Sequence, residues 1–412
     1  MEHDAGRIFA VHDFLLAGLS FLVCGFILCL GRISQRIAGH RNLNAVQATH
    51  TRPTPRLGGV GVFLGLGFTF LFVSAPLVSP YGKFILATSL LFLVGLAEDL
   101  GFGVSALRRL LAVCLASLLV MFLLGVWMPR TDIPLLDAGM GHWAIGIPVT
   151  LLVTAGIANG FNLIDGVNGL AAVTAIAGAV ALGLIASNAG LTNMVHLTTM
   201  LAATVVGFLI WNFPFGRIFL GDAGAYTLGF VLSWFAIAIL LRVPEASPWG
   251  LLLTLFWPVA DTLLAIWRRV RRKAPTMAPD RLHVHQLVMR ALEIHLLGRG
   301  KRHIANPLTT VVLLPFVVAP PIAGVMLWDD TRGAFLAVLA FTILFFGSYM
   351  LAFPLLARLQ RQNGTRRQVT EPRLRDLRKA RADDAASDPQ TVQGHSTMAR
   401  TISSTTATAS TS

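Results

Sequence analysis

Long apolar segments alternate with short polar ones along the whole chain, and this alternation predicts a bundle of membrane-spanning helices. A helix needs roughly 20 predominantly apolar residues to cross the hydrocarbon layer of a bilayer. The segments that come close to this length cover residues 12–30, 57–78, 82–97, 110–128, 144–159, 169–187, 196–212, 223–241, 249–267, 308–328 and 333–357. The expected fold is an all-α polytopic membrane protein with about eleven transmembrane helices.

The composition excludes an ordinary soluble domain. Apolar residues make up 55% of the 412, charged residues only 13%, and the mean hydropathy is +0.68. These values are typical of a polytopic membrane protein. The first seven residues, MEHDAGR, carry two acids and one arginine, and no small-residue cleavage site follows them. The first apolar segment is therefore not expected to be a cleavable signal peptide, and we expect it to remain as a helix.

The distribution of lysine and arginine predicts the orientation. Eleven spans place the two termini on opposite sides of the membrane, and basic residues favour the cytoplasmic side. With the N-terminus outside, the outer segments hold five basic residues and the inner segments 28, or 18 without the ten from Arg358 onward. We therefore expect a periplasmic N-terminus and a cytoplasmic C-terminus. The net charge of +13 then reflects topology and anionic lipid rather than nucleic acid, for which we expect no binding.

Most side chains with catalytic potential fall on loops that this orientation places at the cytoplasmic face. Glu98, Asp99, Asp165 and Asp222 each lie at a predicted helix end, and Asp261 lies within a span near its inner end. Such acids can cap helices, but ionisable residues at the membrane edge usually serve function. Hard oxygen ligands of this kind suit Mg²⁺.

Two histidines and several arginines on the same loops could bind phosphate. His283 and His285 precede an amphipathic helix, whose N-terminus suits an anion; the same helix could instead lie on anionic lipid. Arg108 and Arg109 could contact a diphosphate or only anchor the membrane edge. Phe219 could stack on a base, and Arg56 lies beside a Pro/Gly turn that either binds phosphate or is only a turn.

The chain divides into two parts. Residues 1–357 form the predicted transmembrane catalytic domain, including a cytoplasmic loop with an amphipathic helix at about 268–307, and residues 358–412 form a basic, then Ser/Thr/Ala-rich tail that we expect to be disordered. The three cysteines lie in predicted spans without metal-type spacing, so neither a disulfide framework nor a zinc site is expected.

Six motifs in order resemble those of the polyprenyl-phosphate N-acetylhexosamine-1-phosphate transferases, glycosyltransferase family 4. They are HTRPTPRLGG (50–59), GLAEDL (95–100), NGFNLIDGVNGLA (159–171), WNFPFGRIFLGDAGAY (211–226), PVADT (258–262) and DRLHVHQ (280–286). The resemblance implies transfer of a sugar 1-phosphate from a UDP-N-acetylhexosamine to undecaprenyl phosphate, with release of UMP. It implies a multi-pass protein of the bacterial inner membrane, Mg²⁺ (or Mn²⁺) as cofactor, and a homodimer as a further expectation.

The resemblance also assigns roles to individual residues. It implies that Asp222 is the principal metal ligand, with the pair Glu98 and Asp99 beside the metal and the lipid phosphate. It also implies that Phe219, Asn212 and Asn162 help to hold the nucleotide of the UDP-sugar donor. The residues expected to act in catalysis are Glu98, Asp99, Asp165, His283 and His285; those expected to bind substrate are Arg56, Arg109, Asn162, Asn168, Asn212 and Phe219; those expected to bind metal are Asp99 and Asp222.

The sequence departs from the family pattern at three points. Glu98 stands where the family commonly has Asp, and Asn168 stands where it has the second Asp of a DGxDG motif. The loop motif around His283 and His285 lacks a third imidazole. The last change favours the branch that primes O-antigen or other surface polysaccharides, acting on N-acetylglucosamine or a deoxy relative such as N-acetylquinovosamine or N-acetylfucosamine. The alternatives are the phospho-N-acetylmuramoyl-pentapeptide transferase of peptidoglycan synthesis and a secondary transporter, in which polar interruptions of spans mark a substrate site.

Overall fold

A computed structural model describes residues 10–30, 54–271, 282–298 and 300–351. These residues form helices that are joined by loops. The predicted tail at 358–412 and part of the predicted loop at 268–307 lie outside these residues. The helices are α1 (Val11–Cys29), α3 (Gly58–Phe68), η1 (Thr69–Phe72), α4 (Ala75–Asp99), α5 (Ala106–Leu124), α6 (Pro134–Met140), α7 (Trp143–Ile164), α8 (Leu170–Asn188), α9 (Thr192–Asn212), α10 (Gly221–Arg242), α11 (Pro248–Thr254), α12 (Phe256–Arg271), α13 (Val284–Ala291), the π-helix η2 (Leu292–Leu297), α14 (Arg302–Met326) and a last helix at Thr331–Leu351.

The prediction of an all-α polytopic membrane protein is confirmed. Nine helices among the described residues are long and apolar enough to cross a bilayer, and α11 and α12 together form a tenth candidate that is bent by 87°. The remaining predicted span corresponds to the shorter apolar helix Gly58–Phe72. Each of the eleven apolar segments therefore contains a helix among its described residues, as expected for a backbone that must satisfy its hydrogen bonds internally within a bilayer.

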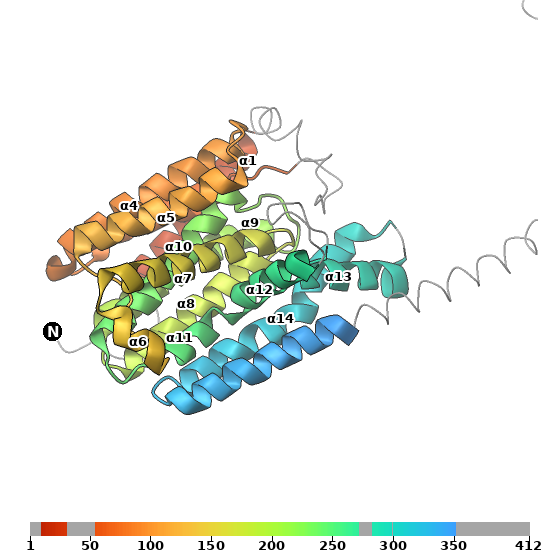
Figure 1. The fold of residues 1–412 in the computed structure, drawn as a ribbon. Helices are drawn as coiled ribbons and strands as arrows, with labels where there is room; N and C mark the ends of the chain where they lie inside the picture. The colour runs from red at the N-terminus through yellow and green to blue at the C-terminus, as the bar shows by residue number, and fades with distance from the viewer. Residues whose placement is uncertain (1–9, 31–53, 272–281, 299, 352–412) are drawn as a thin grey trace, which may run out of the picture. The chain divides into compact units, whose positions relative to one another are not determined.

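Helix α10 is the centre of the bundle. Every residue from Gly221 to Phe235 is buried, and the helix packs against α3, α4, α7 and α8. Figure 1 shows α10 beside α7, with α4 and α5 on one side and α8 and α14 on the other. Because α10 has no face left for lipid, its two ends are positioned by all of the surrounding helices.

Close packing between α3 and α10 depends on glycine. A Cβ on Gly59 would collide with the backbone of Gly224, and would lie 2.8 Å from the carbonyl oxygen of Leu220. The approach is held by backbone hydrogen bonds, in which the amides of Gly58 and Gly59 donate to the carbonyls of Phe219 and Leu220 over 2.8 and 2.9 Å. The segment that carries Arg56 is thereby joined to the start of α10.

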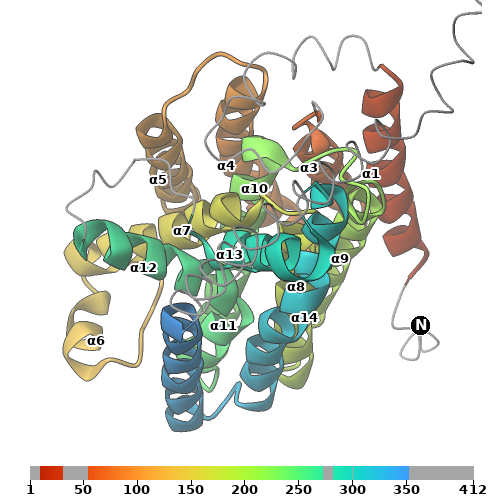
Figure 2. The same ribbon diagram turned by 90° about the vertical axis from the view of Figure 1, so that its right-hand side faces the viewer.

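The last part of the bundle brings a short helix to the end at which α10 begins. After the 87° bend, α12 packs against α7 and α14. Helix α13 packs against α14 and continues into η2. Figure 2 looks on to this end of the bundle and shows α13 over the middle of it.

The glycine contact between α3 and α10 predicts a local sensitivity to added volume. Gly59→Ala places a methyl group against the α10 backbone, and overpacking of this kind costs about 1–3 kcal/mol. We expect a lower thermal unfolding midpoint for the detergent-solubilised protein, measured by intrinsic fluorescence.

Gly67→Ala on the same helix is the matched control, because a Cβ at Gly67 has nothing within 4 Å. Alanine favours a helix over glycine by roughly 0.5–1 kcal/mol, so this midpoint should stay unchanged or rise. Equal behaviour of the two variants would contradict the packing role.

Candidate active site

The first amides of α10 bind two carboxylates from other helices. The amides of Asp222 and Ala223 donate to the two carboxylate oxygens of Asp99 over 2.9 and 2.8 Å, and the amide of Gly221 donates to Asp165 over 3.1 Å. The first N–H groups of a helix have no partner within the helix and carry a partial positive charge. The ends of α4 and α7 are therefore fixed to the start of α10.

Gly221 is required at this junction. Its φ of +70° lies in the left-handed region, and a Cβ there would collide with the Arg56 carbonyl and lie 2.5 Å from the Asp99 carboxylate. Only glycine adopts this conformation without strain and leaves room for both groups.

Asp222 lies between two arginines. Arg56 Nη2 is 2.7 Å from its Oδ1, and Arg109 forms an ion pair with its Oδ2. Asn162 also donates to Oδ1, over 3.1 Å. The Asp222 side chain is buried, whereas that of Arg56 is 37% exposed and that of Arg109 18% exposed. The arginines thus link the buried carboxylate to the edge of the protein, where an anion can approach.

Local spacing explains how α7 contributes to this cluster. Asn159, Asn162 and Asp165 recur at intervals of three residues, which places them along one side of the helix end. Asn159 accepts a hydrogen bond from Tyr226 over 3.3 Å, and the Arg109 guanidinium lies 6.0 Å from the Tyr226 ring centroid. Tyr226 therefore supports Arg109 and α7 together.

Burial raises the pKa of Asp165 to about 7. The Arg56 charge and hydrogen bonds from the amides of Gly221 and Leu220 oppose this effect. Four acids (Glu98, Asp99, Asp165 and Asp222) face two arginines here, and one Glu98 carboxylate oxygen, Oε2, is buried without a hydrogen-bond partner in the described chain. The cluster therefore has acceptor capacity for a cation.

A second cluster lies where α12 meets the start of α13. His283 Nδ1 is 2.7 Å from Asp261 Oδ2, and the rings of His283 and His285 stack with centroids 5.5 Å apart. Burial lowers the pKa of His285 to about 4, the nearby His283 adds to this effect, and the Asp261 charge opposes it. His285 is therefore a neutral imidazole near pH 7.

The two clusters adjoin through the turn between α7 and α8. A Cβ on Gly166 would lie 3.5 Å from His285 Nε2, and Gly166 directly follows Asp165. Neither nitrogen of His285, nor Nε2 of His283, has a hydrogen-bond partner within the described ranges. These imidazole nitrogens are available to a polar ligand beside Asp165.

The donor set fits a magnesium ion that is shared with a substrate. Mg²⁺ is usually held by one or two carboxylates together with substrate phosphates and water, and Asp99, Asp165 and Asp222 supply hard oxygens around one helix end. Across the described residues, no group of three or more histidine, cysteine or acidic side chains is arranged to hold a metal alone. The residues therefore fit a shared ion rather than a complete protein cage.

The structure brings most of the predicted site residues together. Those that meet around the start of α10 and α13 are Arg56, Glu98, Asp99, Arg109, Asn162, Asp165, Asp222, His283 and His285. Arg108, by contrast, is exposed. The chemical roles of all these residues stay predictions.

Three predicted substrate ligands make contacts within the fold instead. Asn212 accepts from the Gly169 amide over 2.6 Å and donates to the Ile218 carbonyl over 2.7 Å. Asn168 donates to the Pro214 carbonyl over 2.8 Å. Phe219 is buried, with its amide donating to the Pro55 carbonyl over 2.9 Å. These contacts shape the loops around the site, and a direct role in binding stays a prediction.

Other supporting residues had weaker sequence signals or none. Asp261 lies within a predicted span, and only the structure pairs it with His283. Tyr226 follows Asp222 by one helical turn, and this spacing could have indicated it. Asn306 accepts from the Asn168 amide over 2.8 Å; it lies in α14, more than a hundred residues away, where no local pattern marks it.

The fold and these two clusters define a polytopic membrane protein with a carboxylate, arginine and imidazole site at one end of its helices. Residues 81–240 match the model of glycosyl transferase family 4. The chain is 28% identical over 267 residues to a probable undecaprenyl-phosphate N-acetylglucosaminyl 1-phosphate transferase of Bacillus subtilis, covering 64% of this chain and 74% of that protein.

Two further relatives extend this similarity. The undecaprenyl-phosphate alpha-N-acetylglucosaminyl 1-phosphate transferase of Yersinia pestis is 28% identical, covering 59% of this chain and 67% of that protein. The decaprenyl-phosphate N-acetylglucosaminephosphotransferase of Mycobacterium leprae is 28% identical, covering 71% of this chain and 81% of that protein. The family-model match and these relatives support the resemblance to glycosyl transferase family 4 that the motifs indicate.

The lowered pKa of His285 predicts a pH-dependent stability. The ordinary pKa of the imidazole is 6.5, and in the folded protein it is about 4. Between these pH values the unfolded chain is protonated at His285 and the folded protein is not. This imidazole therefore lowers stability as the pH falls through that window, by up to about 3 kcal/mol. His285→Gln should reduce the fall in unfolding midpoint between pH 7 and pH 4.

His295→Gln serves as the control, because His295 is exposed on the neighbouring π-helix. Its midpoint should follow the wild-type pH dependence. If His285→Gln also followed it unchanged, the burial of a neutral imidazole would be refuted.

Proposed function

We propose that the protein transfers N-acetylglucosamine 1-phosphate from its UDP-activated form to a polyprenyl phosphate, with release of UMP. The observation that carries the proposal is the convergence of four acids, two arginines and two imidazoles at the start of α10. All three relatives named above are polyprenyl-phosphate N-acetylglucosamine phosphate transferases by name, which favours this sugar over its deoxy relatives.

The arginines suit the diphosphate of the donor. Arg56 and Arg109 both contact Asp222 and both retain exposed surface. A guanidinium binds phosphate oxygens through paired hydrogen bonds. In the proposed complex they orient the diphosphate beside Asp222 and stabilise negative charge that spreads over the transferred phosphoryl group.

The imidazoles complete the proposed phosphate site. Asp261 holds His283 through Nδ1, which directs the opposite nitrogen, Nε2, away from that contact. His285 stacks on His283 and lies beside Gly166. Donation from these rings to phosphate oxygens requires no charge on His285, because a neutral imidazole still carries one N–H.

Asp222 and Asp99 would hold Mg²⁺ together with the donor phosphates, where the ion would neutralise charge and polarise the bond to the leaving UMP. The acceptor needs little activation, because the second pKa of a phosphate monoester is about 6. Glu98 then positions the lipid phosphate rather than removing a proton from it.

The proposed product is a lipid-linked diphospho-sugar that primes a surface polysaccharide such as O-antigen, at the inner membrane of a bacterium. The undecaprenyl- and decaprenyl-phosphate relatives support a polyprenyl acceptor. The two-histidine loop at His283 and His285 favours this reaction over transfer of phospho-N-acetylmuramoyl-pentapeptide. The location of the polar groups at helix ends opposes a transporter, whose site lies near mid-membrane.

Purified protein is expected to form lipid-linked product and UMP in equal amounts from undecaprenyl phosphate, Mg²⁺ and UDP-N-acetylglucosamine. Asp222→Asn should lower turnover by about 100-fold or more, because loss of one charge-stabilising group in such a site costs this much. Asp329→Asn, at an exposed position, should retain wild-type turnover. No product from folded wild-type protein with any UDP-N-acetylhexosamine would refute the proposal.

The neighbouring arginines provide a matched pair for the phosphate contact. Arg109→Ala should lower kcat/KM by about 10- to 100-fold, because it removes a guanidinium from the buried Asp222. Arg108→Ala changes an exposed residue one position away and should have little effect. Equal losses of kcat/KM in the two variants, measured as initial rates, would instead indicate that both arginines only anchor the protein at the membrane edge.

A further inference from the structure

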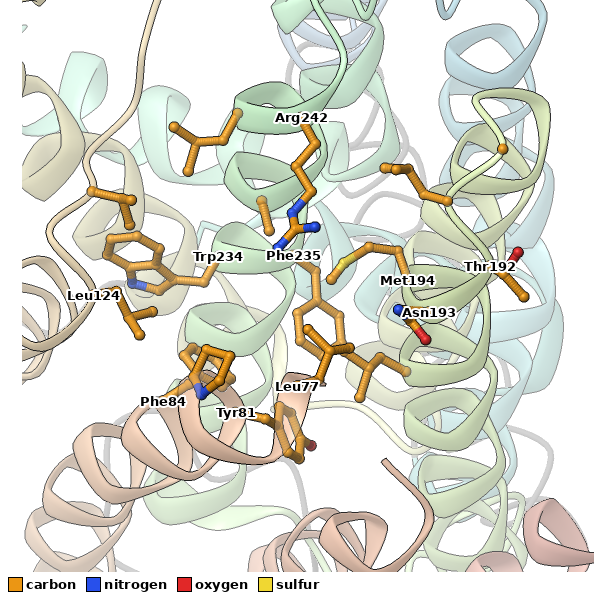
Figure 3. Close-up of a pocket in the computed structure, with 17 residues that line it drawn as sticks. Leu77, Tyr81, Phe84, Leu124, Thr192, Asn193, Met194, Trp234, Phe235 and Arg242 are labelled. Carbon is orange, nitrogen blue, oxygen red and sulfur yellow. The ribbon is translucent and has the colours of Figure 1, made fainter. Parts of the chain in front are cut away.

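A cavity of about 620 Å³ lies at the end of the bundle away from the carboxylates. It is bounded by the start of α4, the end of α5, the start of α9 and the end of α10 (Figure 3). Arg242, which lines it, is the last residue of α10, whereas Asp222 is the second. They are 20 positions apart in one helix, or about 30 Å at 1.5 Å per residue, so this cavity is distinct from the candidate active site.

The lining changes from apolar to polar toward the helix ends. Phe84 and Trp234 lie well inside α4 and α10, and both are buried. Thr192 and Asn193 begin α9 and Arg242 ends α10, so the polar groups lie at the mouth. A site with an apolar interior and polar mouth suits an amphiphile, and its volume is within the range of small-molecule sites, about 300–1,000 Å³.

The mouth carries a positive charge. No aspartate or glutamate lines the cavity, and Arg242 forms no ion pair with any residue in the described ranges. Figure 3 shows its side chain directed toward Phe235. Asn193 Oδ1 accepts a hydrogen bond from Ser74 over 3.1 Å, which leaves its amide nitrogen as the group to offer a ligand. The mouth is therefore suited to anionic oxygens.

We propose that this cavity binds an anionic glycerophospholipid from the surrounding bilayer. One acyl chain lies among Phe84, Trp234 and Phe235, where van der Waals contacts with these side chains replace its contacts with other lipid tails. The phosphate lies at Arg242, beside Asn193. A zwitterionic lipid would bring a second positive charge toward Arg242, so the site prefers a headgroup with net negative charge.

The proposal predicts selective lipid retention. Full-length protein is delipidated in detergent, incubated with phosphatidylglycerol or phosphatidylcholine, and examined by native mass spectrometry. We expect one phosphatidylglycerol to be retained in preference to phosphatidylcholine, and Arg242→Gln to lower its retention at least fivefold. Arg332→Gln, at an exposed position that does not line the cavity, should behave as wild type.

Fluorescence quenching tests the depth of the acyl chain. Phosphatidylglycerol with a brominated chain should quench tryptophan fluorescence, and Trp234→Phe should reduce the quenched fraction. This variant should fold, because Trp234 Nε1 makes no hydrogen bond to a described residue. Trp267→Phe, on α12 outside the cavity, should leave the quenched fraction attributable to the bound lipid unchanged.

Four results would overturn the proposal: equal retention of the two lipids, full retention by Arg242→Gln, equal loss in Arg332→Gln, or quenching unaffected by Trp234→Phe. Displacement of phosphatidylglycerol by equimolar undecaprenyl phosphate would reassign the cavity to the polyprenyl chain. None of these results depends on the proposed transferase reaction, whose failure would be seen separately in the UMP assay.

Discussion

The arrangement of the site depends on the amides at the start of α10, which have no partner within the helix. These amides bind Asp99 and Asp165, so two acids far apart in the chain are fixed against a third, Asp222, by backbone groups. A helix N-terminus must satisfy its free N–H groups, and its dipole favours carboxylates. Acids that would repel one another in isolation are held together because each has a fixed donor.

The charges around Asp222 favour binding over stability. A buried ion pair repays its desolvation poorly, and apolar residues of similar volume often stabilise a fold as well or better. Arg56 and Arg109 nevertheless converge on the buried carboxylate of Asp222, and Arg56 Nε also lies 3.9 Å from Asp99 Oδ1. In the proposed complex, a diphosphate and a divalent ion share these groups.

Helix α10 connects two chemically different ends. Its first turn carries carboxylate chemistry, whereas its last turn borders an apolar cavity with an arginine at the mouth. Between them the helix is buried on every side from Gly221 to Phe235. Such a helix behaves as a rigid unit, because packed protein interiors deform little. Occupancy of the cavity would therefore stabilise the helices that also hold the site.

The sequence alone determined the class of fold and indicated most of the residues that meet at the candidate site. Apolar length dictates where helices must form, because a bilayer offers the backbone no other partners, and motif order identified the acids and histidines that converge. The tertiary structure decided which of them touch. It separated Arg109 from Arg108 by burial, turned Asn168 and Asn212 toward loop backbone, and paired Asp261 with His283. These outcomes depend on long-range helix packing, which residue spacing along one helix does not encode.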